Sequence, residues 1–322
     1  MGGESRDGKA YMSRLRVGFL GVRQGLPLLR ACRERDDLDV LGVSDRDTER
    51  LGAVSAGFNV PFASTDPEKL LALDGLEAVF IATSDREHRK QIAEALGHGL
   101  HVYCAGPLTH TPEDCRSLIS SAKHHRERYV MVGHAARFHA FCQGAHQVVA
   151  AGDIGTPYLV RVELYAVAEP VPEDARAAAG MSSHPFVREG YAGVDLARLF
   201  AGELASVNAR SVQKVMLELP FDDTLSARYL SAQGAVAEVL LAYGARRPPG
   251  LVLSILGTDG ALHAASFSRQ NAWWSHVRGE ITRHDLPADP TDTGVGALLD
   301  EFVTAIRSDR RPVPGLVDGV RT

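Results

Sequence analysis

Short, continuous apolar segments alternate with amphipathic helical stretches between Leu15 and Val132, and this alternation constrains the fold most strongly. Apolar runs of strand length that do not alternate with polar residues are typical of strands buried on both faces. Such strands form parallel sheets covered by helices. We therefore predict a doubly wound, Rossmann-like α/β domain over residues 14–134, with strands at 15–20, 38–43, 78–82, 101–104 and 129–132.

Capping sequences mark the starts of two intervening helices. Thr111 and Asp66 are each followed by a proline and a glutamate. A side-chain oxygen at the N-cap accepts backbone N–H bonds, and proline is favoured at the first helical position. We interpret the carboxylates of these two segments as capping groups rather than catalytic groups.

Beyond residue 134 the apolar residues alternate with polar ones, a pattern that indicates strands with one buried and one wetter face. We predict a second, α+β domain over residues 135–322 with a large, mostly antiparallel open sheet, and a polar tail over residues 1–13. The expected strands are 158–165, 206–212, 225–231, 236–243 and 251–256, and the expected helices are 145–151, 191–201 and 295–308. Residues 175–189 form a long connection, and loops of that length are often functional.

Charge and cysteine content narrow the class of partner. The chain has 35 basic and 40 acidic residues and a net charge of -5, so it lacks the basic footprint of a protein that binds nucleic acid or anionic membranes. Its four cysteines form no C-x-x-C pair and indicate reduced thiols. The first 13 residues are polar and lack the apolar region of a secretory signal, and no apolar run approaches the roughly 18 residues needed to span a bilayer. We expect a cytoplasmic protein with small-molecule or protein partners.

Several motifs occur in an order and spacing that resembles the Gfo/Idh/MocA oxidoreductases over nearly the whole chain. They are GLHVYCAGP at 99–107, Thr83 followed by His88, VGH at 132–134 with Arg137-Phe138, and the turns GDIG at 152–155 and GTDG at 257–260. The resemblance implies NAD or NADP in the first domain, with Thr83 and His88 beside it. It also implies a sugar-like ligand between the domains and a homo-dimer or tetramer. His88 could instead be a helix residue hydrogen-bonded to the backbone.

The residues that handle the substrate proton in that family are missing from this chain. The family signature G-x-H-V-x-x-E-K-P carries a catalytic lysine, and its Glu-Lys pair is Ala105-Gly106 here. In the best alignment of the family's D-x-x-x-H motif, Arg188 and Ala192 replace the aspartate and histidine, whereas Asp195 keeps a downstream aspartate. A positioned acid or base supplies about 10²- to 10⁴-fold in rate. We therefore predict that standard hydride transfer is lost.

The phosphate loop also departs from the dinucleotide fingerprint G-x-G-x-x-G. Gly21 matches the first glycine, but Arg23 and Leu26 stand at the second and third positions, with Gly25 between them. We expect Leu26 to push the helix away from the strand. Arg23 would either fill the space of the phosphates or bind a phosphate directly through its guanidinium.

Asp45 ends the second predicted strand, about 20 residues beyond the loop, where a carboxylate receives a ribose diol in dinucleotide-binding domains. Arg46 beside it would meet a 2′-phosphate. Alternatively, Asp45 or Asp47 caps the next helix. The sequence leaves both interpretations open, and with them the choice between NAD and NADP.

Three residues near the same crevice are candidates to replace the missing acid. They are His184, Tyr191 and Arg188, of which we assign His184 and Tyr191 as the candidate catalytic residues. The alternatives are that His184 is an ordinary loop histidine and that Tyr191 packs at a helix start.

Arg137, Arg188 and Asp195 are expected to line the ligand crevice, and the two arginines would favour an anionic ligand. No H-x-x-x-H pair with a carboxylate is present, so we predict no metal site. Trp273-Trp274 is either a platform for stacking a ligand or a packing or subunit contact.

Three functions remain after this sequence analysis. The first is a divergent oxidoreductase homologue with a nucleotide-binding fold but without standard hydride transfer, acting as a ligand-binding sensor or partner protein. The second is an active NAD(P)-dependent oxidoreductase on a sugar-like alcohol or carbonyl, with a relocated acid. The third is a non-redox lyase or cyclase that uses the same crevice. The departures in the phosphate loop predict that NAD or NADP binding is weak or lost. Knowing whether the protein binds a nicotinamide nucleotide would reduce the uncertainty most, because tight binding with Arg23 on the phosphates would favour the second function.

Overall fold

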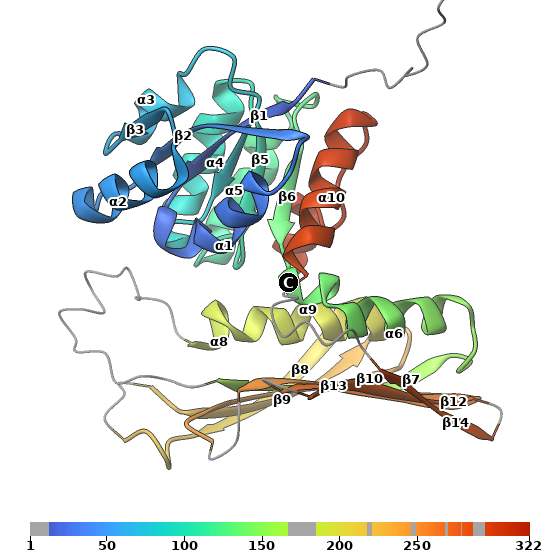
Figure 1. Cartoon of the computed structure of the whole chain (residues 1–322). Helices are drawn as coiled ribbons and strands as arrows, with labels where there is room; N and C mark the ends of the chain where they lie inside the picture. The colour runs from blue at the N-terminus through green and yellow to red at the C-terminus, as the bar shows by residue number, and fades with distance from the viewer. Residues whose placement is uncertain are drawn as a thin grey trace, which may run out of the picture.

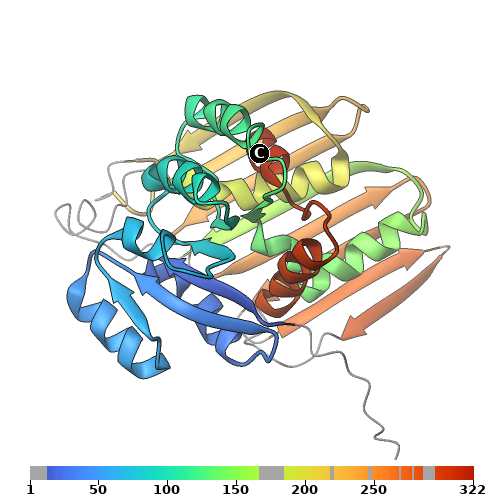
Figure 2. The same cartoon turned by 90° about the horizontal axis from the view of Figure 1, so that it is seen from above.

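The structure, a computed structural model, describes residues 13–166, 185–217, 221–245, 249–267, 270–277, 279–285 and 294–322. His184 and most of the long connection predicted at 175–189 lie outside these residues. The chain forms a parallel α/β domain that lies above a large open sheet (Figures 1 and 2).

The first domain confirms the prediction of a doubly wound parallel sheet. Its six strands run in the order β3-β2-β1-β4-β5-β6, and every neighbouring pair is parallel. The strands are β1 (Leu15–Leu20), β2 (Leu38–Ser44), β3 (Phe62–Ser64), β4 (Ala78–Ile81), β5 (His101–Ala105) and β6 (Val130–Gly133). The strand β3 was not predicted, because a strand of 3 residues leaves no periodic signal in the sequence.

The helices of this domain begin where the capping sequences predict. Thr111 accepts a hydrogen bond from the Asp114 backbone N–H at 3.2 Å, and Asp66 accepts one from Glu68 N–H at 3.1 Å. The helices are α1 (Val22–Arg33), α2 (Thr48–Phe58), α3 (Pro67–Leu71), α4 (Asp85–Gly97) and α5 (Pro112–Ala122).

The second domain contains an eight-stranded sheet in the order β14-β13-β12-β11-β7-β10-β9-β8, in which only β7 and β10 pair in parallel. The strands are β7 (Pro157–Ala166), β8 (Leu204–Val212), β9 (Thr224–Ser231), β10 (Val236–Tyr243), β11 (Gly250–Gly257), β12 (Gly260–Phe267), β13 (Gln270–Val277) and β14 (Glu280–Asp285). The last three strands were not predicted. Their small and polar residues lack an alternating apolar pattern, and their conformation depends on the successive pairing of β12 with β11, β13 with β12 and β14 with β13.

Helices cover one face of this sheet and leave the other bare among the described residues (Figure 1). Leu196 and Phe200 of α9 and Phe141 of α6 join the buried side chains of β7, β10 and β11 in one core cluster. The helices of this region are the 3₁₀ turn η1 (Ala135–Phe138), α6 (Ala140–Ala150), α8 (Pro185–Arg188) and α9 (Gly190–Ala201). No helix among the described residues is both long and apolar enough to cross a bilayer.

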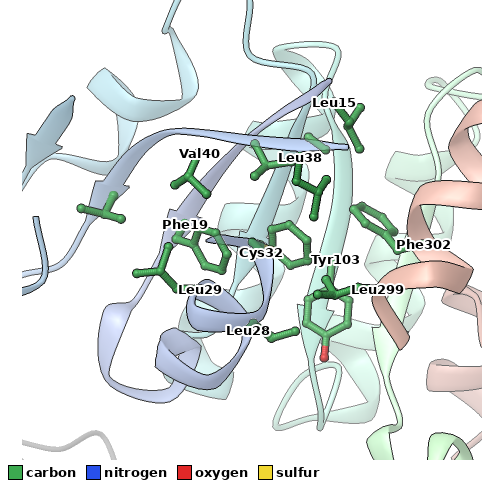
Figure 3. Close-up of a cluster of buried hydrophobic side chains, with 14 of the residues drawn as sticks. Leu15, Phe19, Leu28, Leu29, Cys32, Leu38, Val40, Tyr103, Leu299 and Phe302 are labelled. Carbon is green, nitrogen blue, oxygen red and sulfur yellow. The ribbon is translucent and has the colours of Figure 1, made fainter. Parts of the chain in front are cut away.

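The C-terminal segment returns to the first domain, although it lies within residues 135–322, the range predicted for the second domain. Phe302 of α10 (Val295–Arg307) packs edge-on against Phe80 of β4, with ring centroids 5.4 Å apart. Figure 3 shows Phe302 and Leu299 beside Tyr103 and the buried side chains of β1, β2 and α1. The last helix, α11 (Leu316–Arg321), packs against α5 and β6. The first domain is therefore completed by residues distant in sequence.

Candidate functional site

A cleft of about 550 Å³ lies at the carboxyl ends of β1, β2 and β4. Ligands bind at this edge of open α/β sheets. Five of the predicted cofactor residues line the cleft, namely Gly21, Arg23, Asp45, Arg46 and Thr83. Gly25 and His88, the other two, do not line it.

Gly21 turns the chain from β1 into α1 at the centre of the cleft. Its φ of 85° lies in the left-handed region, and a Cβ there would come within 2.5 Å of the Ala82 carbonyl oxygen. Only glycine fits this position. Because Gly21 is also the N-cap, it has no side chain to occupy the N–H groups of the first turn of α1. A helix start of this kind is suited to a phosphate.

Gly25, rather than Leu26, faces the strands. A Cβ at Gly25 would lie 3.4 Å from the Ala82 Cβ and from Phe19 Cδ1, so the helix approaches β1 and β4 through this glycine. Leu26 is half-buried and packs against the core cluster of the first domain. The expectation that Leu26 pushes the helix away from the strand is therefore wrong.

Asp45 joins the end of β2 to the start of α1. Its carboxylate accepts a hydrogen bond from Val22 N–H at 2.9 Å and another from Asp47 N–H at 3.0 Å. Asp47, not Asp45, caps α2 by accepting from Arg50 N–H at 2.9 Å. Arg50 lines the same cleft as Asp45 and was not predicted as a site residue. Its position three residues after the N-cap Asp47 is the sequence signal that could have identified it. Asp45 remains half-buried and lines the cleft.

His88 lies beneath the cleft and is 1% exposed. Its ring nitrogens lie 3.0 Å from the Pro107 carbonyl oxygen and 3.2 Å from that of Thr83. Burial lowers the pKa of His88, which favours the neutral ring. His88 therefore links the segments that follow β4 and β5. This agrees with the alternative that His88 is a helix residue hydrogen-bonded to the backbone. Thr83 itself donates a hydrogen bond to Gln91, another residue of the cleft wall.

Tyr191 of α9 fills the space next to Gly106, at the end of β5. A Cβ at position 106 would lie within 2.5 Å of the Tyr191 hydroxyl oxygen and would also overlap its ring. The hydroxyl donates a long hydrogen bond, 3.4 Å, to the Gly133 carbonyl. Burial raises the pKa of Tyr191, so the phenol keeps its proton at neutral pH. Here the structure brings together two residues that the sequence analysis had considered separately.

Asp195 is fully buried and holds a cluster of polar residues behind Tyr191. Arg137 donates two hydrogen bonds to its carboxylate, at 2.7 and 2.6 Å, and His134 Nδ1 lies 2.5 Å from it. Burial raises the pKa of Asp195, but the bonds from His134 and Arg137 outweigh it and hold the pKa at about 2. Asp195 therefore does not line an open crevice.

The expectation that Arg137 and Arg188 attract an anionic ligand is not supported. Arg137 is already compensated by buried Asp195, and Arg188 pairs with Glu189 at 2.7 Å. Both guanidinium charges are thus paired within the protein. An anion would have to displace carboxylates that are already in place.

Two family models match the chain. Residues 15–134 match the oxidoreductase family, NAD-binding Rossmann fold, and residues 142–263 match the GFO/IDH/MocA C-terminal domain. The chain belongs to the Gfo/Idh/MocA family. The first match covers β1 through β6, so it places the cleft around Gly21 in the NAD-binding domain of this family.

Relatives within the Gfo/Idh/MocA family carry the names of dehydrogenases. The chain is 24% identical, over 92% of both chains, to 4-carboxy-2-hydroxymuconate-6-semialdehyde dehydrogenase from a Sphingobium strain. It is 24% identical to D-apiose dehydrogenase from Rhizobium rhizogenes, over 76% of this chain and 70% of that protein. An oxidoreductase from Agrobacterium radiobacter, solved in complex with NAD+, L-tartaric acid and magnesium, shares the fold. Its TM-score is 0.86 at 20% identity, over 96% of this chain and 93% of that one.

The remaining predictions concern metals and tryptophans. No group of three or more His, Cys, Asp or Glu side chains within the described residues could hold a metal ion. Trp274 lies on β13 with its ring 6.0 Å from that of His263 on β12, and is 36% exposed. It therefore lies on the large sheet, away from the cleft of the first domain.

Proposed function

We propose that this Gfo/Idh/MocA protein binds NAD or NADP in the cleft around Gly21 and does not carry out the family's lysine-dependent hydride transfer. The observation that carries this proposal is the position of Tyr191, whose ring and hydroxyl occupy the space of any side chain at residue 106. A role as a ligand-binding sensor or partner protein would be compatible with the absence of turnover. This role stays a prediction.

The residues of the cleft fit a dinucleotide. Gly21 forms the tight turn into α1 and contributes no side chain to the helix start. Asp45 holds the Val22 N–H, and the N–H groups that follow it in the first turn of α1 would bind the pyrophosphate. Asp45 would receive a ribose, and Arg23 is exposed at the cleft wall without an ion pair among the described residues. A bound nicotinamide would supply the capacity to accept or donate a hydride.

The proton-handling side of the reaction is what this chain lacks. In the resemblance to the family signature, Gly106 stands in place of the lysine, and a glycine offers no group to donate a proton. The neighbouring Tyr191 hydroxyl is directed to the Gly133 carbonyl. Its raised pKa makes it a weak acid at neutral pH. These observations support a centre in which binding is retained and standard proton transfer is not.

A second candidate function is an NAD(P)-dependent oxidoreductase that uses Tyr191 as its acid. It is favoured by the proximity of the Tyr191 hydroxyl to Gly106 and by the dehydrogenase names of the relatives. In this alternative the phenol would turn from Gly133 toward a bound substrate. No observation among the described residues favours the lyase or cyclase alternative.

Fluorescence titration with NADH and NADPH tests the binding. We expect saturable binding of at least one of them, weakened by about tenfold or more in Gly21→Ala because the new Cβ overlaps the Ala82 carbonyl and displaces the turn from β1 into α1. Gly52→Ala is the matched control, since a Cβ at Gly52 on α2 meets nothing within 4 Å. Circular dichroism shows whether each variant is folded. The proposal would be refuted if the wild type bound neither NADH nor NADPH.

The same titration distinguishes NAD from NADP. If Arg46 meets a 2′-phosphate, Arg46→Ala should weaken NADPH binding by about tenfold and leave NADH binding unchanged. If Asp45 selects a free ribose diol, NADH should bind more tightly than NADPH, and Asp45→Ala should remove the difference.

A turnover assay separates the two candidate functions. We expect no NADH or NADPH oxidation above background with a panel of aldoses, keto-polyols and their derivatives, and no reduction of NAD or NADP with the matching alcohols. Steady turnover that disappears in Tyr191→Phe, with nucleotide binding intact, would instead establish the tyrosine-dependent oxidoreductase.

A further inference from the structure

A second cavity, of about 640 Å³, lies between the end of α5, the start of β6 and residues 311–318. Val130, which lines it, is the first residue of β6, whereas the dinucleotide cleft lies at the carboxyl ends of the strands. The two cavities are therefore at opposite edges of the same sheet. A volume of this size falls in the range of about 300–1,000 Å³ that holds small molecules in proteins.

The floor of this cavity is aliphatic. Ile119 and Ala122 of α5, Val130 of β6, and Pro312 and Leu316 of the C-terminal segment form it. That segment is fixed along the edge of the sheet, because Val132 N–H donates to the Pro314 carbonyl at 3.1 Å and Met131 forms a β-bridge with Gly315. Backbone hydrogen bonds thus hold the walls of the cavity in place.

The rim of the cavity is cationic in a chain whose net charge is -5. Its charged lining residues are four basic ones, Lys123, Arg126, Arg128 and Arg311, and one acidic one, Asp318. The Asp318 carboxylate is engaged by Gly315 N–H at 2.9 Å at the start of α11.

The cations of the rim are not compensated within the described residues. Lys123, Arg126 and Arg311 are exposed and form no ion pair there. Arg128 donates to the backbone carbonyls of Gly99 and Glu127, which leaves its charge in place. The local field at the cavity mouth therefore favours an anion.

We propose that this cavity binds an alkyl carboxylate, with its hydrocarbon chain on the aliphatic floor and its carboxylate among Lys123, Arg126 and Arg311. Burying the chain removes apolar surface from water, and charge-assisted hydrogen bonds hold the carboxylate. The one aromatic residue of the lining, Tyr129, has its hydroxyl bound to Asp309 at 2.7 Å, so no pair of rings is present to stack a flat aromatic ligand. The aliphatic lining therefore favours a flexible aliphatic body.

Isothermal titration calorimetry of the full chain with decanoate, below its micelle concentration, tests the proposal. We expect saturable binding of one decanoate per chain, weakened by at least about tenfold in Lys123→Glu/Arg126→Glu. The matched control is Lys69→Glu/Arg30→Glu, which makes the same charge change at exposed positions outside the cavity and should bind decanoate like the wild type. Decanol, which has the same chain without the charge, should bind at least about tenfold more weakly than decanoate.

A second variant tests the aliphatic wall. Val313 lines the cavity and is 58% exposed, so Val313→Asp should leave the fold intact and weaken decanoate binding. The proposal is overturned if decanoate does not bind at millimolar concentration. It is also overturned if the cavity charge variant binds like its control, or if decanol binds as tightly as decanoate. Because none of these measurements uses a nicotinamide nucleotide, the result is independent of the function proposed for the other cleft.

Discussion

Tyr191 and Gly106 depend on each other, although 84 residues of sequence separate the end of β5 from α9. The tyrosine ring fits only because residue 106 has no Cβ, and the glycine leaves no empty space because the ring fills it. Interiors are packed so closely that one added methyl group in such a place must displace its neighbour. The pair therefore behaves as one structural unit at the centre of the protein.

Gly106→Ala should lower the free energy of unfolding by about 1–3 kcal/mol, since the new Cβ overlaps the Tyr191 ring. In a Tyr191→Ala background the same change should cost less than about 0.5 kcal/mol, because the ring is gone. Urea denaturation of the four proteins gives the coupling. Additive effects would show that the two side chains do not compete for this space. For the same steric reason, Gly106→Lys by itself should not create a dehydrogenase.

Asp195→Asn tests the buried cluster at the level of single charges. At pH 7 the change should cost about 3–5 kcal/mol, because it leaves Arg137 without its buried partner. The pKa of Asp195 is about 2 in the folded protein and about 3.9 in an unfolded chain. Its contribution is therefore complete above about pH 4 and is lost as the pH falls toward 2. Urea denaturation at several pH values should show the variant and the wild type converging over that interval, and a constant difference would contradict the assignment.

At the scale of elements, α10 is the clearest departure from the order of the chain. It follows the whole second sheet in sequence, yet Leu298, Leu299, Phe302 and Val303 are buried in the core of the first domain. Figure 3 shows Phe302 directed at the same cluster as Phe19 and Tyr103. The parallel sheet is thus stabilised by a helix whose residues follow the whole second sheet in the chain.

Phe302→Ala should destabilise the first domain by about 3–5 kcal/mol, because it leaves a cavity beside Phe80 and Tyr103. Thr304→Ala on the same helix is exposed and should change stability by less than about 0.5 kcal/mol. Hydrogen exchange of β1, β4 and β5 provides the readout. Faster exchange confined to the second sheet in Phe302→Ala would contradict the packing described here.

At the scale of the whole molecule, the bare face of the large sheet is the surface through which we expect self-association. It is not a plain apolar face, since the apolar face is the one covered by α6 and α9. A row of side chains crosses it, in which Glu238 accepts from Arg161 at 2.6 Å and from Arg228 at 2.7 Å. Leu230 and Ile281, on the same face by strand register, are 48% and 75% exposed.

We predict a homo-dimer or tetramer formed through this face. Leu230→Arg/Ile281→Arg should convert it to a monomer, because the two arginines add charge and bulk to a self-complementary contact. Val313→Arg, at an exposed valine beside β6 of the first domain and outside the large sheet, should keep the wild-type assembly. Light scattering at micromolar concentration measures the mass of each. A monomeric wild type, or an unchanged mass in the double variant, would contradict the prediction.

The sequence by itself determined the parallel sheet, the capped helices and the five residues that meet at the dinucleotide cleft. Those features depend on local signals, namely apolar runs, N-caps and the places where strands end, and the matches of the Gfo/Idh/MocA models agree with them. Tertiary structure alone decided that Tyr191 fills the space at Gly106 and that Arg137 is neutralised by Asp195. It also decided that α1 packs closely on the strands through Gly25, although Leu26 was expected to push the helix away. Finally, it decided that α10 completes the core of the first domain. Each of these depends on contacts between segments far apart in the chain, where side-chain volume and charge meet partners that no local pattern identifies.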